Sequence, residues 1–428
     1  MIDSEMKQDY GLWFVYVMHL YVMFRPSEII VFNTFYPIYL LALLVIALNV
    51  KKLHLLLSDR ALNIIFILIF SLLLLSVFNS YVHDFYDRKL LFNWLAWLVV
   101  LVAVILSYQG SNKNYKGLEL LAKLVLLIQL CISIVQLFKP DFFSLFWSSV
   151  NTMGLDRDVR VSGSLGNPIL FSYIVTYLVL IVIARTGPLK NIFWVVLGCL
   201  LILMSGSRSL IMTYPIIIGA WFYLSDKSLL KRLFFSFICA SVLFLFSYYM
   251  LLSLKEIFVY SAELFAVFEF ESGEENSKDL RTFGYRIDFW NAALYEFFSR
   301  DFLSVIFGKS GPYLSSPHHD LIYMLSRYGA IGLISYLALN FWLLEIALKN
   351  KCIVEGRLLY LTILMSLIVG MANTIGVEMR LGIFSALVAG LLLSRGKYSK
   401  VITNVEIKSS IVMNNEIQRV SSNKSLPA

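Results

Sequence analysis

The chain has 428 residues, of which 59% are hydrophobic and 15% are charged, and its formal net charge is +8. Water-soluble domains do not have this composition, so the sequence predicts a polytopic membrane protein. Lysines and arginines that anchor cytoplasmic loops account for a basic excess in such a protein, and nucleic-acid binding is not implied.

A helix that crosses a membrane needs roughly 17–25 mostly apolar residues. By this measure the sequence predicts an all-α protein of twelve spans, at about 11–24, 29–49, 61–78, 91–109, 118–138, 168–185, 191–205, 209–224, 233–253, 320–348, 357–376 and 380–394. Lys and Arg are about twice as frequent in the short loops on one side as on the other, and the richer side is expected to be cytoplasmic. Both termini are therefore predicted to lie in the cytoplasm.

Residues 1–394 are predicted to form a single membrane domain with two long loops on the outer side, 139–167 and 254–319. Every predicted cytoplasmic loop is a short basic turn, which indicates that chemistry or recognition takes place on the outer side. The segment 395–428 is rich in Ser, Asn and Lys, and it is predicted to be a disordered cytoplasmic tail.

The first long loop ends in Asp156-Arg-Asp-Val-Arg-Val-Ser-Gly-Ser-Leu-Gly-Asn-Pro168. Its glycines allow backbone amides to approach a phosphate closely, Arg160 adds a cation, and Pro168 is suited to open the sixth span. Asp156-x-Asp158 matches a pattern that holds divalent cations in many sugar transferases. A lone match is common by chance, and we predict no metal.

A second motif, Ser205-Gly-Ser-Arg208, lies between the seventh and eighth predicted spans. It places a further cation on the outer face. Arg208 is either an interfacial anchor or a ligand of phosphate, because guanidinium is suited to both roles.

The segment from Leu280 to Arg300 in the second long loop is predicted to form an amphipathic helix. Its apolar residues recur at helical spacing, at Phe283, Ile287, Trp290, Leu294 and Phe297. One interpretation is an interfacial helix that lies on the outer leaflet. The other, compatible with the first, is that Arg281 and Arg286 clamp a phosphorylated lipid, because guanidinium binds phosphate oxygens in a bidentate fork.

The same loop ends in Ser316-Pro-His-His-Asp320 at the start of the tenth span. A neutral imidazole can accept a proton near neutral pH, so His318 and His319 are candidate general bases. Arg327 follows two turns later. A charge within a span is expected to face the protein interior or a water-filled cavity, which makes Arg327 a further candidate ligand of substrate.

Together these segments resemble the superfamily of bacterial O-antigen ligases and Wzy-type repeat-unit polymerases. Arg160-Val-Ser-Gly163 with Gly166-Asn-Pro168 resembles its Arg-x-Ser-Gly…Asn-Pro element, Ser205-Gly-Ser-Arg208 its Ser-Gly-Ser-Arg turn, and His318-His-Asp-Leu…Gly329-Ala-Ile-Gly332 its His-Asn-Asp…Gly-x-x-Gly element. The motif order and the twelve-span layout also agree, so the resemblance covers about residues 30–395. Counting back from Gly329 puts the family histidine at His318, with His319 where the family usually has asparagine. Which imidazole acts is therefore open.

The resemblance implies metal-independent glycosyl transfer, without a cofactor, at the periplasmic face of the bacterial inner membrane. The implied substrates are undecaprenyl-diphosphate-linked glycans, and the implied partners are membrane lipids, a chain-length regulator and a flippase. The arginines expected to bind the diphosphate or glycan are Arg160, Arg208, Arg281, Arg286 and Arg327.

A polymerase is our first choice within this family: the reducing end of a lipid-linked chain moves onto the non-reducing sugar of another lipid-linked unit. The alternative of the same chemistry is an O-antigen ligase, which uses lipid A–core as the acceptor. An alternative of another class is a flippase or other transporter of lipid-linked oligosaccharides, for which charges at the membrane midplane and an inverted repeat are expected.

Overall fold

The computed structural model describes residues 11–21, 35–52, 56, 59–82, 88–108, 112–138, 161–165, 167–224, 233, 236–237, 241, 244, 290–309, 319–371 and 382–395. Within these ranges the chain is all-helical and has no strand. Four helices are long and apolar enough to cross a membrane: Arg60–Asn79, Tyr115–Phe138, Pro168–Thr186 and Asp320–Lys349. Several shorter apolar helices accompany them, so the chain has the character of a membrane protein.

Helices occupy the predicted spans where the structure describes the backbone. They are Gly11–Tyr21, α3 (Phe35–Leu48), α5 (Arg60–Val82), α6 (Arg88–Ser107), α7 (Asn112–Phe138), α8 (Pro168–Thr186), α9 (Ile192–Ser205), α10 (Arg208–Tyr223), α15 (Asp320–Lys349), α16 (Val354–Gly370) and Gly382–Arg395. The predicted span 233–253 lies mostly outside the described residues, as do 139–160, 254–289, 310–318 and 396–428. The number of spans and the side on which the long loops lie stay predictions.

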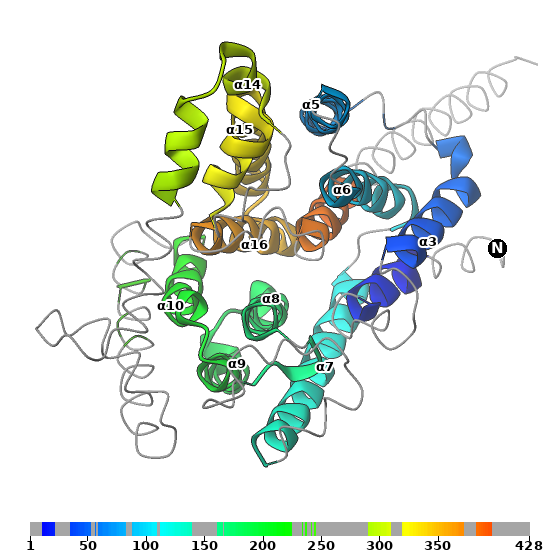
Figure 1. The fold of residues 1–428 in the computed structure, drawn as a ribbon. Helices are drawn as coiled ribbons and strands as arrows, with labels where there is room; N and C mark the ends of the chain where they lie inside the picture. The colour runs from blue at the N-terminus through cyan, green and yellow to red at the C-terminus, as the bar shows by residue number, and fades with distance from the viewer. Residues whose placement is uncertain are drawn as a thin grey trace, which may run out of the picture.

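Helix α8 is the centre of the bundle. Its residues from Leu170 to Ala184 are all buried, because the helix is hydrophobic on every face and has neighbours on every face. It packs against α7, α9, α10 and α16, which surround it in Figure 1. Pro168 occupies the first turn, as predicted, and the side chain of Asn167 accepts hydrogen bonds from the amides of Ile169 and Leu170 at 2.9 and 3.2 Å.

Helix α15 is broken at Gly329, where φ is 68° and ψ is −168°. In a straight helix, the Cα atoms of Asp320 and Tyr336 would be about 24 Å apart. In the structure the Tyr336 hydroxyl donates a hydrogen bond to the Asp320 carboxylate at 3.3 Å. The segment 320–328 therefore bends back toward the segment 330–349, so the predicted span 320–348 is helical on both sides of a bend at Gly329 that the sequence did not predict.

A second glycine and a buried asparagine hold this break. The short helix α14 (Phe302–Phe307) ends at Gly308, and a Cβ on Gly308 would lie 2.2 Å from the Arg327 carbonyl oxygen. The Asn79 amide of α5 donates to the carbonyls of Phe307 and Arg327, at 2.7 and 2.9 Å. Breaks in helices are tolerated inside membranes when the freed carbonyls find such partners.

Two buried carboxylates form ion pairs at the end of the bundle that is predicted to be cytoplasmic. Glu355 lies 2.7 Å from Arg395, the last residue of the final helix, and Glu119 lies 3.0 Å from Arg185. Such pairing is required because an unpaired buried charge is strongly destabilising. The predicted disordered tail comprises residues 395–428. Its first residue, Arg395, belongs to the helix Gly382–Arg395, and residues 396–428 lie outside the described residues.

Replacement of Gly329 by alanine is expected to disrupt the break. The new Cβ would stand 2.4 Å from the Gly308 nitrogen and from the Ile306 carbonyl oxygen, and alanine disfavours a φ of 68°. We expect Gly329→Ala to lower the stability by about 3 kcal/mol, measured as thermal unfolding in detergent. The control is Ile334→Ala, which removes a mostly exposed side chain from the same helix. Equal melting temperatures for Gly329→Ala and wild type would contradict the described packing.

Candidate functional site

The end of the first long loop, residues 161–165, is folded into the bundle. The Gln136 side chain of α7 accepts hydrogen bonds from the amides of Ser162 and Gly163, at 3.1 and 2.9 Å, and donates to the Gly163 carbonyl at 2.9 Å. Gln129, two turns earlier on α7, accepts from the Ser164 amide at 3.0 Å. Two glutamines thus satisfy backbone groups that would otherwise be buried without partners.

The turn Ser205–Ser207 lies directly beside this segment. The amide of Val161, the residue after Arg160, donates to the Met204 carbonyl at 3.2 Å. Gly206 ends α9 in the left-handed conformation, with φ 62°, and the hydroxyls of Ser205 and Ser172 share a short hydrogen bond. The structure therefore brings together the first two motifs of the sequence.

Two helix N-termini, those of α8 and α10, meet at this point. Ser172 in the second turn of α8 contacts Ser205, whose hydroxyl accepts from the amide of Ser207, the residue that precedes α10. The Ser207 hydroxyl is buried and has no hydrogen-bond partner among the residues that the structure describes, and Arg208 is the first residue of α10. Helix N-termini attract anions through their dipole and free amides. In α8, Pro168 has no N–H and Asn167 binds the amides of Ile169 and Leu170, so the N-terminus of α10 is the one suited to bind a phosphate.

His319 precedes the first turn of α15 and is half-buried against Trp290. The two rings meet edge to face, with centroids 5.1 Å apart, and the buried His319 Nδ1 atom has no hydrogen-bond partner within the described part of the chain. Burial lowers the pKa of this imidazole below its usual value of 6.5, and the adjacent helix N-terminus also disfavours a positive charge. His319 is therefore held in the neutral form, which accepts protons at neutral pH.

Asp320 lies behind His319 and faces the interior. Its carboxylate is 2% exposed and accepts the hydrogen bond from Tyr336. A Cβ on Gly370, the last residue of α16, would stand 2.3 Å from it, so only glycine leaves room for the carboxylate there. This contact fixes the start of α15 against the end of α16.

The amphipathic helix of the second loop is described from Trp290 to Phe298, and its predicted apolar stripe is confirmed there: Trp290, Leu294 and Phe297 face inward. The helix lies along 320–328, because Trp290 contacts His319 and Arg300 donates to the Ser326 carbonyl at 2.6 Å. The Arg300 side chain is 3% exposed and also pairs with Glu296 at 2.9 Å. Arg327, the next residue along α15, is buried, as predicted for a charge within a span.

Adjacent residues of α8 join the two halves of the site. Ser172 contacts Ser205 of the arginine motif, and the Tyr173 hydroxyl bonds to Ser366 of α16 at 2.6 Å. Ser366 lies one turn before Gly370 on α16, and Gly370 packs against the Asp320 carboxylate. The three motifs therefore meet around the first turns of α8, at one level of the bundle.

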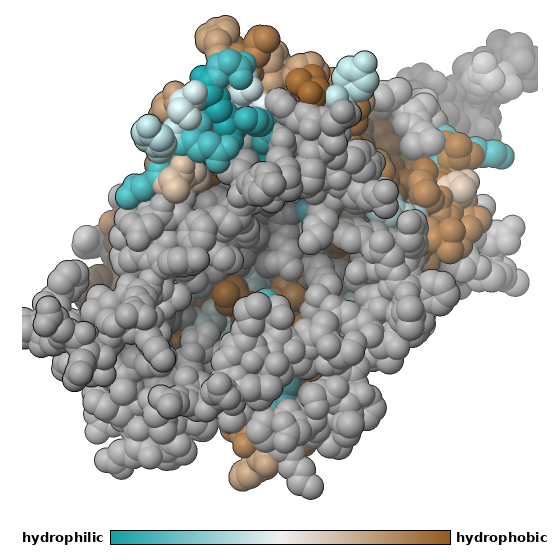
Figure 2. All heavy atoms as spheres, in the orientation of Figure 1, coloured by the Kyte–Doolittle hydropathy of each residue, from teal (hydrophilic) through white to brown (hydrophobic). Residues whose placement is uncertain are grey.

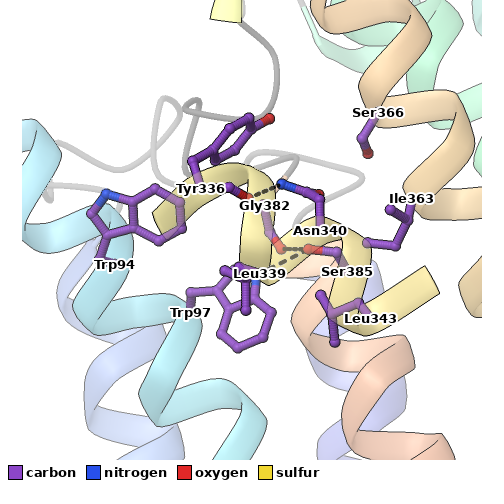
Figure 3. A pocket seen from close by; sticks show the side chains of 10 residues that line it. All are labelled: Trp94, Trp97, Tyr336, Leu339, Asn340, Leu343, Ile363, Ser366, Gly382 and Ser385. Carbon is purple, nitrogen blue, oxygen red and sulfur yellow. Dashed lines mark hydrogen bonds between the residues drawn. The ribbon is translucent and has the colours of Figure 1, made fainter. Parts of the chain in front are cut away.

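A pocket lies beside Tyr336 between α6, α15, α16 and the last helix (Figure 3). The cavity is small, with a volume of about 20 Å³, which is room for about one water molecule. Aromatic, amide and hydroxyl groups line it: Trp94, Trp97, Tyr336, Asn340, Ser366 and Ser385. Trp97 donates to the Ser385 hydroxyl at 2.9 Å.

No protein-family model matches the chain, and no curated protein matches it significantly. Four predicted site residues, Arg160, Arg281, Arg286 and His318, lie outside the described residues, and the side chain of Arg208 is not described. The residues whose placement the structure gives are His319 and Arg327, together with the backbone of Arg208.

Several residues that build the site were missed in the sequence. Gln129 and Gln136 carried a signal, because they are polar residues seven apart within an apolar run. Asn79 carried a similar signal, because it is a polar residue at the end of a predicted span. Tyr173 and Tyr336 carried no signal, because a tyrosine in an apolar helix is most often a core residue.

Proposed function

We propose that the chain is a membrane glycosyltransferase that joins undecaprenyl-diphosphate-linked repeat units into O-antigen or capsular polysaccharide, at the periplasmic face of the inner membrane. The observation that supports this most directly is the meeting of the three motifs around the first turns of α8. They lie far apart in the sequence, and the resemblance assigns them to one reaction. Their juxtaposition is what a shared active site requires.

The N-terminus of α10 supplies the proposed site for the diphosphate. The dipole of α10, the Ser207 hydroxyl and the arginine at position 208 are groups suited to stabilise a phosphate leaving group. Arg160 precedes the anchored segment 161–165 and joins this group in the proposal, as do Arg281 and Arg286 from the second loop. Arg327 is buried in α15, and we propose that its charge adds to the positive potential around the diphosphate.

The proposed base is one of the two adjacent histidines. A sugar hydroxyl of the acceptor attacks the anomeric carbon of the donor, the bond from that carbon to the diphosphate oxygen breaks, and the imidazole takes the hydroxyl proton. Undecaprenyl diphosphate leaves as the anion. The neutral form of His319 supports His319 in this role, whereas the resemblance favours His318.

The function is tested by the glycan pattern of a strain that lacks the gene. If the chain is a polymerase, the deletion strain should lose all glycan chains longer than one repeat unit, and a copy of the wild-type gene should restore them. Lipid-linked long chains that are not attached to lipid A–core would mean a ligase instead. Accumulation of single units on the cytoplasmic face would mean a transporter and would contradict the proposed chemistry.

The phosphate site predicts that lysine cannot replace Arg208. Lysine keeps the charge but loses the bidentate fork, so we expect Arg208→Lys to lower chain synthesis at least about tenfold, since leaving-group stabilisation commonly contributes more than that. Membranes that contain equal amounts of protein are assayed with lipid-linked units. The control is Arg60→Lys at the first residue of α5, which is expected to be silent. Full activity in Arg208→Lys would reduce this arginine to an interfacial anchor.

The histidine assignment predicts an acid limit to activity. If His319 is the base, His319→Asn lowers the rate by about 10²–10⁴-fold, and His318→Asn retains activity. The reverse result would move the base to His318.

Because burial lowers the pKa of His319, activity of the wild type should fall only below the usual histidine range as the pH drops. Trp290→Ala exposes the ring and should shift this acid limb to higher pH, whereas Trp290→Phe, which keeps a ring there, should shift it less.

A further inference from the structure

An exposed apolar face lies on the outer side of the helix 290–298 and of α14. It consists of Tyr295, Phe298, Phe302 and Leu303, whose exposed fractions are 63 to 79%. Tyr295 and Phe298 are three residues apart and share one face of the helix. Phe302 begins α14 after a connection of only three residues. At this end of the molecule, apolar and hydrophilic surfaces lie side by side (Figure 2). Isolated exposed apolar residues are common, but several together mark a binding surface.

The level of this face in the membrane follows from α5. Large apolar side chains along this helix are exposed and suited to face lipid: Ile67, Phe70, Leu74, Val77 and Phe78. From Arg60 to Asn79 the helix rises about 29 Å, close to the thickness of the hydrocarbon core. Asn79 therefore marks the boundary of that core, and its amide holds the last residue of α14 there.

The exposed face adjoins the side of α5 that is suited to face lipid. The rings of Phe78 and Phe307 are in contact, with centroids 5.3 Å apart, and Phe78 is itself half-exposed on the side suited to face lipid. Aromatic residues at this level are typical of the belt that proteins place between acyl chains and headgroups. Lys309, two residues after the end of α14, is exposed and provides a positive charge for lipid phosphates.

We propose that the face formed by Tyr295, Phe298, Phe302 and Leu303 is seated in the phospholipid leaflet, at the boundary between headgroups and acyl chains. The two exposed carboxylates nearby do not oppose this position. Glu296 is paired with Arg300, and Asp301 caps α14 by accepting from the Ser304 amide at 3.1 Å. Both charges therefore have partners within the chain.

Insertion of this face into the leaflet would fix the depth of the helix 290–298, which carries Trp290, in the membrane. Because Trp290 contacts His319, and Arg300 contacts Ser326, the leaflet then holds the histidine segment at headgroup level. That is the level at which the phosphates of any polyprenyl-linked substrate lie. The proposed position of the face in the leaflet does not depend on the proposed glycosyl transfer and can be tested separately.

The experiment measures which quencher reaches the face. In the full chain with its four cysteines replaced by alanine, Phe298→Cys and Phe302→Cys are labelled one at a time with a bimane fluorophore. The protein is placed in vesicles of phosphatidylethanolamine and phosphatidylglycerol. Spin-labelled phospholipids carry the quencher either near the headgroup or near the chain end, and iodide serves as the quencher in water.

We expect the label at 298 or 302 to lose about half of its fluorescence with the shallow spin label and little with iodide, as for an interfacial helix. The control Asn291→Cys, on the exposed polar face of the same helix, should show the reverse. Ile67→Cys in α5 should respond most to the deep spin label. Iodide quenching at 298 and 302 equal to that at 291 would overturn the proposal, because the face would then lie in water.

Two other outcomes would also overturn it. Protection from all three quenchers would mean that protein, such as a second copy of the chain, covers the face. Quenching that matches Ile67→Cys would place the face in the hydrocarbon core. Since fluorescence quenching requires no catalysis, each result is independent of whether the chain transfers sugars.

Discussion

A helix that breaks inside a membrane protein leaves carbonyl groups that lipid cannot satisfy. The arrangement around Gly329 meets this constraint with a backbone contact to Gly308 and with two hydrogen bonds from Asn79. Because the break is satisfied, the segment 320–328 can turn back toward its own helix. Asp320 then reaches Tyr336 and packs against Gly370, and His319 comes to lie against Trp290.

The same requirement shapes the other half of the site. The segment 161–165 enters the bundle without regular secondary structure beyond one short 3₁₀ turn, and Gln129 and Gln136 bind its amides and carbonyl. A buried loop held in this way is rigid, because releasing it would leave several polar groups unsatisfied. Rigid placement is what leaving-group stabilisation needs, since donors must be in position before charge develops.

The sequence predicted the helices well because lipid demands apolar segments of a minimum length, and Pro168 and the amphipathic stripe through Trp290 followed local rules. It did not predict the bend. Gly329 stood in a recognised Gly-x-x-Gly pattern, but its conformation depends on Gly308 and Asn79, which come from distant segments. Arg300 was expected to end an amphipathic helix, and its bond to Ser326 arises only because the two helices lie together. Contacts of this kind are set by packing rather than by local sequence.

The way in which α7 binds the loop has a consequence for how such proteins diverge. Gln129 and Gln136 contact mainly the main-chain atoms of residues 162–164, and every amino acid except proline presents the same N–H and C=O groups. Substitutions at Ser162 and Ser164 can therefore accumulate while the path of the backbone stays the same. Gly163 is the exception, because its φ is 55° and a Cβ would stand 2.3 Å from the Phe171 ring. In homologous chains the paired glutamines and this glycine would outlast the residues on either side of it.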